Sequence, residues 1–260
     1  EFFSASVGVR GLSENQRILA FATDDVGRRK YTIRFLDLET GEYLEDVIPD
    51  VTPNVVWAAD DETLFYTRQD PETLRWYQVY RHTVGTYTAS DVLVYEEADE
   101  EFSVSVGRSK SRELLVIMSY QTLSTEVRYA PAAAPESEFA VALEREREHE
   151  YSVAHYGDHF YIRTNDQHRN FRLAVAEEAT PDEANWETLI EGSDEHYLTG
   201  HLCFRNQLIL AERIAGLDQI RVISNPGEPD ADEHYIEFPE ASYAVSFGSN
   251  AEYDPDHLRL

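Results

Sequence analysis

Residues 64–82 read LFYTRQDPETLRWYQVYRH, two strand-like segments joined by a turn-forming stretch. The first opens with the apolar run Leu64, Phe65 and Tyr66, and the second, 77–81, is rich in aromatic and β-branched residues. Short runs of this kind, bounded by turn residues, predict neighbouring antiparallel β-strands. This stretch decides the fold because its pattern recurs along the whole chain.

The recurrence is regular enough to measure. Short apolar runs are centred at Leu19, Leu64, Leu115, Tyr161, Ile209 and Leu258, with intervals of 45, 51, 46, 48 and 49 residues. Each run is preceded by a short strand and a turn and is followed by a third strand, and often by a fourth. Four strands repeating about every 45–50 residues are the signature of propeller blades. A β-sandwich with irregular hairpins is the alternative, but a sandwich need not keep so even a period.

We therefore expect an all-β fold, a β-propeller of four-stranded blades with about five complete blades and part of a sixth. The approximate blades are residues 1–49, 50–98, 99–144, 145–192 and 193–240, with a partial blade at 241–260. The chain begins Glu1-Phe2-Phe3 and stops in a strand-like stretch, so we expect a piece of a longer protein. Such an incomplete ring would leave strand edges free, and we expect self-association.

The chain is strongly acidic. Its 260 residues include 22 Lys and Arg against 50 Asp and Glu, a formal net charge of −28. This excludes nucleic-acid binding through a basic footprint and a polybasic membrane surface. The sequence has no apolar run long enough to cross a membrane, and its single cysteine, Cys203, favours the reducing cytoplasm. The acidity suggests adaptation to high salt, with attraction of cationic substrates as the alternative.

Residues with catalytic potential lie in unsuitable contexts. No Gly-x-Ser-x-Gly elbow is present, and Ser193 and Ser249 read as turn residues. Cys203 lies in a strand pattern that favours packing over nucleophilic chemistry. His155 and His159 are separated by a turn, so they do not form a metal-binding pair on a helix face. We expect no catalytic residue, no metal ligand and no cofactor in this chain.

Other polar and aromatic positions have structural explanations. The pairs Asp24-Asp25 and Asp60-Asp61 lie at turns, where aspartate bonds the local backbone, with calcium binding as a weaker alternative. The pair Arg28-Arg29 lies in a turn, either simply solvated or in contact with another domain. Large aromatic residues recur at blade positions and are expected to pack between blades: Trp57, Tyr66, Trp76, Tyr80 and Phe160.

Several blocks, in order along nearly the whole chain, resemble the oligopeptidase B group of the prolyl oligopeptidase family. They are LETG at 38–41, LFYTR at 64–68, YQVYRH at 77–82, VYEEAD at 94–99, STEVRY at 124–129, HEYSV at 149–153, FYIRTND at 160–166, NFRL at 170–173 and ER at 212–213 with GL at 216–217.

The resemblance implies a seven-bladed propeller that caps an α/β-hydrolase domain carrying a Ser-Asp-His triad. It implies a serine-type endopeptidase that cleaves short peptides after Arg or Lys, while the propeller filters out large substrates. The triad lies outside these residues, so the fragment alone is expected to be inactive. Arg28 and Arg29 match a paired-arginine turn of the family and are expected to face the hydrolase domain; Asn165 and Asn170 match positions that shape a hairpin.

The alternative is a stand-alone propeller that binds proteins or carbohydrates and has no enzymatic domain. The reading frame beyond Leu260 distinguishes the two. A Gly-x-Ser-x-Gly segment followed by Asp and His supports the peptidase, whereas an early stop codon supports the scaffold.

Overall fold

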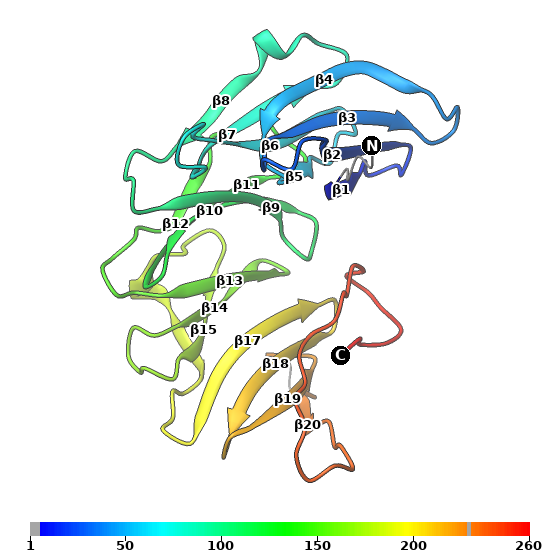
Figure 1. Cartoon of the computed structure of the whole chain (residues 1–260). Helices are drawn as coiled ribbons and strands as arrows, with labels where there is room; N and C mark the ends of the chain where they lie inside the picture. Colours follow the sequence, from blue (N-terminus) through cyan, green and yellow to red (C-terminus); the bar gives the residue numbers. More distant parts are fainter. Residues whose placement is uncertain (1–5, 228–229) are drawn as a thin grey trace. The chain divides into compact units, whose positions relative to one another are not determined.

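A computed structural model describes residues 6–227 and 230–260. Its regular structure is β-strand apart from two short 3-10 turns, η1 (Thr88–Ser90) and η2 (Glu183–Asn185). The strands form five four-stranded antiparallel sheets, labelled in Figure 1. The prediction of an all-β chain with five four-stranded blades is confirmed. Residues 1–5 of the expected first blade lie outside the described residues.

Within each sheet the strands follow one another in chain order, which is the up-and-down order of a propeller blade. The five sheets are β1 (Ser6–Leu12), β2 (Ile18–Asp24), β3 (Tyr31–Asp37) and β4 (Tyr43–Val51); β5 (Val55–Trp57), β6 (Thr63–Gln69), β7 (Trp76–Thr83) and β8 (Val92–Glu96); β9 (Ser103–Arg108), β10 (Leu114–Gln121), β11 (Ser124–Pro131) and β12 (Ala140–Leu143); β13 (Tyr151–Tyr156), β14 (His159–Thr164), β15 (Arg172–Glu177) and β16 (Glu187–Ile190); and β17 (His196–Phe204), β18 (Gln207–Ile214), β19 (Leu217–Ser224) and β20 (Asp232–Tyr235).

The chain forms two compact units, and each is described by itself. The first holds residues 1–108 with most of β10 and β11. Here five consecutive residues of β6 are buried. Since successive side chains of a strand point to opposite sides, both faces of β6 are buried. Leu64 and Tyr66 pack with Ala20, Ile33 and other residues of the first sheet. Phe65 points the other way and packs with residues of the third sheet, so β6 is sandwiched between neighbouring sheets.

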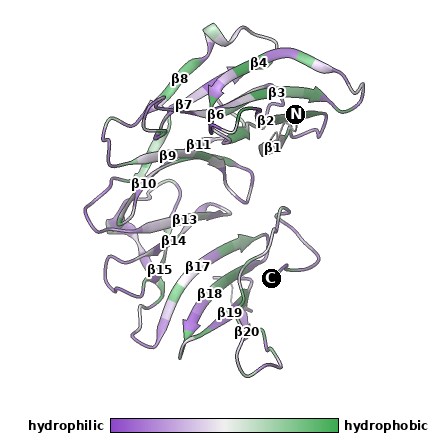
Figure 2. Ribbon diagram, in the orientation of Figure 1, coloured by the Kyte–Doolittle hydropathy of each residue, from purple (hydrophilic) through white to green (hydrophobic). Residues whose placement is uncertain are grey.

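The second unit, which includes residues 142–260, repeats this arrangement in β18. Leu208 and Leu210 pack with Leu173 and other residues of the fourth sheet. Ile209 lies on the opposite face, in a cluster with Phe204, Ile220 and Val222. Both central strands are therefore hydrophobic at successive positions, while polar residues concentrate in the turns (Figure 2).

Four segments that read as strands in the sequence, 170–173, 235–238, 243–246 and 257–260, differ in the structure. Phe171 has a φ of 67°, which interrupts extended backbone, so β15 begins at Arg172 rather than at Asn170. The strand expected at 235–238 ends at Tyr235. The segments 243–246 and 257–260 are not strands; instead Val245, Phe247 and Leu258 pack on the apolar cluster of the fifth sheet. The peptide N–H of Gly248 donates to the carbonyl of Arg259, 2.9 Å away, and pins this segment as an irregular hairpin.

The fourth strand of each sheet lies at a sheet edge; β4, β8, β16 and β20 are mostly exposed, whereas β12 is mainly half-buried. These edges are acidic. Glu45, Asp46 and Asp50 lie on β4, which also contains Pro49. Acidic residues also occur on β8 (Glu96), β16 (Glu187) and β20 (Asp232 and Glu233), and Glu144 directly follows β12. No helix within the described ranges is long and apolar enough to cross a membrane.

Candidate functional site

Two aspartates shape neighbouring turns at one end of the first two sheets. The carboxylate of Asp24 accepts the N–H groups of Val26, Gly27 and Arg29 at 3.0, 2.8 and 2.7 Å. Burial acts to raise the pKa of Asp24, but these backbone donors outweigh it and lower the pKa. Asp70 similarly accepts the N–H of Thr73 at 2.7 Å. The prediction that turn aspartates bond their own backbone is confirmed at Asp24, and also at Asp60, which accepts the N–H of Thr63 at 2.9 Å.

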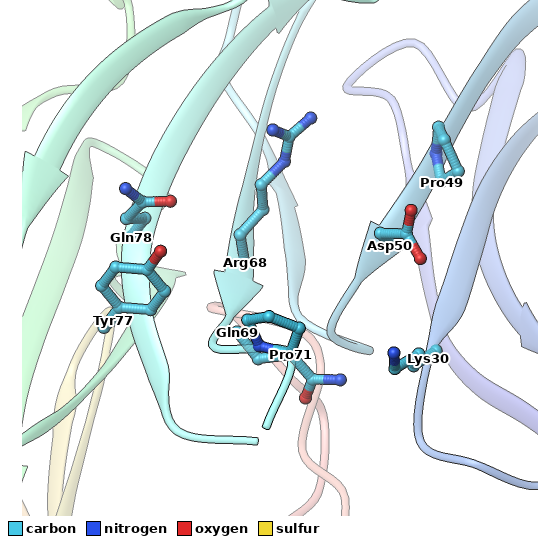
Figure 3. Close-up of a pocket in the computed structure, with 8 residues that line it drawn as sticks. All are labelled: Lys30, Pro49, Asp50, Arg68, Gln69, Pro71, Tyr77 and Gln78. Carbon is cyan, nitrogen blue, oxygen red and sulfur yellow. The ribbon is translucent and has the colours of Figure 1, made fainter. Parts of the chain in front are cut away.

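A hollow of about 420 Å³ lies beside these turns, wholly within the first unit (Figure 3). The lining residues come from the end of β4, the end of β6, the following turn and the start of β7, together with Lys30 just before β3. They are Lys30, Pro49, Asp50, Arg68, Gln69, Pro71, Tyr77 and Gln78. Sequence reasoning did not identify this site, because the lining residues are spread over four segments of chain.

Arg68 is the charged group that the hollow orients most firmly. Its guanidinium carbon lies 4.6 Å from the centroid of the Tyr80 ring and 5.7 Å from that of Tyr66. Cation–π contacts of this kind hold an arginine in place without neutralising its charge. The Nε atom of Arg68 is buried and has no hydrogen-bond partner among the described residues. The hollow therefore presents a positioned positive charge.

The exposed turn that contains Arg28 and Arg29 lies next to the hollow. The amide of Gln69, which lines the hollow, donates to the carbonyl of Arg29. Both arginine side chains are exposed, and neither pairs with a carboxylate among the described residues. Their expected contact with a hydrolase domain stays a prediction.

His82 makes a second polar centre, buried between the first and second sheets. Its Nδ1 lies 2.7 Å from a carboxylate oxygen of Asp91, and its Nε2 lies 3.0 Å from one of Asp46. The imidazole is 0% exposed, and both carboxylates are buried. Only a doubly protonated ring donates to both partners. Asp91 also accepts the Tyr66 hydroxyl at 2.8 Å, and Asp46 accepts the Gly85 N–H at 2.7 Å.

The corresponding interface in the second unit contains different chemistry. His201 Nε2 lies 3.0 Å from the carbonyl oxygen of Tyr161, and burial lowers the pKa of His201 to about 4 despite this bond. Arg163 donates from Nε to the carbonyl of Leu198 at 2.7 Å, and its guanidinium carbon lies 3.4 Å from the centroid of the Phe171 ring. A neutral histidine and an arginine stacked on a ring thus occupy this interface.

The second unit also contains a hydrogen-bonded chain of Ser111, His155 and Glu178. Ser111 Oγ lies 2.7 Å from His155 Nδ1, and His155 Nε2 lies 3.0 Å from Glu178 Oε2. These residue types can form a catalytic triad. However, the imidazole is almost fully buried, which leaves a substrate little access to it. The sequence could not indicate this chain, because its members lie 44 and 23 residues apart.

The remaining candidates have structural surroundings. Ser193 Oγ accepts the Glu195 N–H at 3.1 Å, and the carbonyl of Ser249 accepts a hydrogen bond from Arg259. Cys203 is buried, which raises the pKa of its thiol well above the usual range. His155 is buried whereas His159 is exposed. Within residues 6–227 and 230–260, no cluster of three His, Cys, Asp or Glu residues could hold a metal ion.

Asn165 and Asn170, expected to shape a hairpin, lie in the connection between the paired strands β14 and β15 and also tie neighbouring loops together. Asn165 Oδ1 accepts the Glu150 N–H at 2.9 Å, and its amide donates to the carbonyl of Glu148. Asn170 donates to the carbonyl of Ser193 at 2.8 Å, joining the loops before β15 and β17. These contacts order the backbone, and neither side chain faces a reactive group.

Residues 4–260 match the family described as prolyl oligopeptidase, N-terminal beta-propeller domain. The chain belongs to this family. It is 39% identical over 255 residues to dipeptidyl aminopeptidase BI of Pseudoxanthomonas mexicana, covering 98% of this chain and 35% of that protein. It is 30% identical to Protease 2 of Moraxella lacunata, covering 98% of this chain and 36% of that protein. The chain thus spans about a third of the length of these relatives.

Solved structures agree with this assignment. The structure of oligopeptidase B from Leishmania major superposes with a TM-score of 0.92 at 24% identity, covering 100% of this chain and 37% of that one. Oligopeptidase B from Trypanosoma brucei, in a closed form with covalently bound antipain, gives a TM-score of 0.89 at 24% identity and covers 98% of this chain and 36% of that one. At this level of identity the likeness establishes the fold alone.

Proposed function

We propose that this chain is the propeller portion of a serine oligopeptidase similar to oligopeptidase B. The observation that carries the proposal is the family match over residues 4–260, together with 39% and 30% identity to two named peptidases. The longer protein would supply an α/β-hydrolase domain with the Ser-Asp-His triad. It would act in the cytoplasm on short peptides after Arg or Lys, and the propeller would exclude large substrates.

In this proposal the chain contributes a scaffold rather than a reacting group. Ser193 and Ser249 hold turns, Cys203 is buried as a thiol, and Ser111 bonds a histidine that has almost no exposure. A serine nucleophile needs an accessible hydroxyl, an activating base and donors for the oxyanion. The 260 residues alone should therefore have no peptidase activity.

The test compares the 260-residue chain with the protein encoded by the whole reading frame, using peptides that release a fluorophore after Arg or Lys. We expect turnover by the longer protein and none by the chain alone. An open reading frame without a downstream Gly-x-Ser-x-Gly segment would contradict the proposal and favour a binding scaffold. If the 260 residues alone cleave the peptides and Ser111→Ala abolishes this turnover, catalysis would instead be assigned to the hydrogen-bonded residues Ser111, His155 and Glu178.

Removal of dipeptides from a free amino terminus is a second candidate, favoured by the higher identity to a protein named dipeptidyl aminopeptidase. Paired reporters separate the two activities. A peptide with a blocked amino terminus reports internal cleavage, and the same peptide with a free terminus two residues before the scissile bond reports dipeptide release. Turnover of the blocked peptide supports the endopeptidase, and turnover of the free peptide alone supports the dipeptidyl enzyme.

A further inference from the structure

The hollow at the end of the first two sheets contains positive charge without a counter-charge at bonding distance. Arg68 rests on the Tyr80 and Tyr66 rings, and no described carboxylate lies within salt-bridge distance of it. Its buried Nε lacks a partner within the described part of the chain. Buried polar atoms are nearly always bonded in folded proteins, so the Arg68 guanidinium has hydrogen-bonding capacity that the described residues leave unused.

Lys30 lines the same hollow and also has no ion-pair partner among the described residues. It is one of only two lysines in a chain with 50 acidic residues. Other arginines of the chain do pair with carboxylates, among them Arg17 with Asp37 at 3.0 Å and Arg172 with Asp166 at 2.7 Å. Two free cations in one hollow of such an acidic protein indicate a place for an anion.

The rest of the lining indicates the kind of anion. Figure 3 shows Arg68 standing between Tyr77 and Gln78 on one side and Pro49 and Asp50 on the other. Two cations and the Asp50 carboxylate give the hollow a formal charge of +1, which suits a singly charged anion better than a dianionic phosphate. The planar guanidinium fork matches the two oxygens of a carboxylate.

We propose that this hollow is a binding site for a carboxylate, held by the Arg68 guanidinium and supported by the Lys30 ammonium. Two sources share this chemistry, the carboxyl terminus of a short peptide and the side chain of an acidic residue. The amides of Gln69 and Gln78 already donate to the Arg29 carbonyl and the Glu96 carboxylate, so their carbonyl oxygens and the Tyr77 hydroxyl are the groups left to bond amide N–H groups of such a ligand. The site is independent of the proposed peptidase activity, because binding requires no hydrolysis.

The experiment is calorimetric titration of the purified protein at low salt with four probes. Acetyl-Ala-Ala presents a terminal carboxylate, acetyl-Glu-amide a side-chain carboxylate, acetyl-Ala-Ala-amide neither, and inorganic phosphate a multivalent anion. We expect at least one carboxylate probe to bind more tightly than both the amide and phosphate, and the stronger of the two names the source. Equal binding of the amide, or tighter binding of phosphate, would overturn the proposal.

Variants locate the binding. Arg68→Gln should weaken the stronger carboxylate probe by about tenfold or more, the loss expected for a hydrogen-bonded charge pair. Lys30→Gln should weaken it less, and Asp50→Asn should tighten it by removing a like charge. Arg28→Gln, on the adjacent turn but outside the hollow, is the matched control and should leave binding unchanged.

Arg68→Lys guards against a folding defect. It keeps the charge but loses the fork, so a folded Arg68→Lys protein should bind with intermediate affinity. Unchanged affinity in both Arg68 variants, or an equal loss in Arg28→Gln, would show that the hollow is not the site.

Discussion

Two interfaces between sheets have similar apolar cores but different polar groups. One lies between the first and second sheets, and the other between the fourth and fifth sheets. Both have a large apolar cluster around a doubly buried central strand, β6 or β18. In the first, His82 lies between the carboxylates of Asp46 and Asp91. In the second, His201 and Arg163 meet backbone carbonyls and an aromatic ring. In the first interface the histidine bridges two buried carboxylates, whereas in the second it is neutral and meets a backbone carbonyl.

Removing the histidine from the first interface should have the largest effect. His82→Leu leaves two carboxylates buried without their shared donor, and we expect the free energy of unfolding to fall by about 3–5 kcal/mol. Urea denaturation measures this loss. A neutral triple variant, Asp46→Asn with His82→Gln and Asp91→Asn, should recover much of it, because no buried charge is then left unpaired. A loss below about 1 kcal/mol in His82→Leu would mean that the network carries little energy.

The equivalent change in the second unit should cost less. Arg163→Met removes the hydrogen bonds to the Leu198 carbonyl and the Tyr197 side chain, and the contact with the Phe171 ring, but it leaves no buried charge without a partner. We expect a loss of about 1–2 kcal/mol in the same denaturation experiment. Arg163→Lys, which keeps the charge, is the companion variant and should lie between the two proteins. A loss as large as that of His82→Leu would remove the distinction between the interfaces.

The smallest effect at neutral pH is expected from His201, whose replacement changes how stability depends on pH below 6.5. The pKa of His201 is about 4 in the fold against an ordinary value of 6.5, so between these values the unfolded chain binds a proton that the folded chain does not. The free energy of unfolding is therefore unaffected by this group above pH 6.5, and it declines as the pH falls from 6.5 towards 4. His201→Gln should therefore flatten the pH dependence of unfolding by at most about 1.4 kcal/mol per pH unit.

Exposed His159 supplies the control for that measurement. His159→Gln should leave the pH dependence close to that of the unmodified protein, since its side chain is solvated in both states. Equal slopes in His201→Gln and the unmodified protein would show that His201 is not held neutral by the interface.

The repeat could be predicted from the sequence because the buried central strands of each blade are short, continuous runs of apolar residues. Strands β2, β6 and β10 could be predicted from their runs of apolar residues; β6 is buried on both faces, whereas β2 alternates between buried and half-buried positions. The edge strands β4, β12 and β16 are short or polar, and the apolar pattern did not predict them. Their pairing is set by the neighbouring strand, which supplies the register, rather than by their own side chains.

The polar centres escaped prediction for a different reason. His82 reads locally as one more residue of β7, and its partners lie 36 residues before it, on β4, and 9 residues after it, just before β8. Its register opposite the buried Leu64 was the available signal, since a histidine on a buried face must find partners. The site around Arg68 could likewise not be predicted, because its other residues come from the start of β3, the end of β4 and the start of β7.

The acidic fourth strands have a consequence for how the protein behaves in a crowded solution. An unpaired strand edge is a template on which another chain can add, and this is a common route to insoluble aggregates. Here every such edge contains or directly adjoins an acidic side chain, and β4 also contains Pro49, which cannot donate a hydrogen bond. Two copies that approach edge to edge therefore repel each other before their backbones can pair. The negative charge on these edge strands thus opposes pairing with a strand of another molecule at the positions where such pairing would begin.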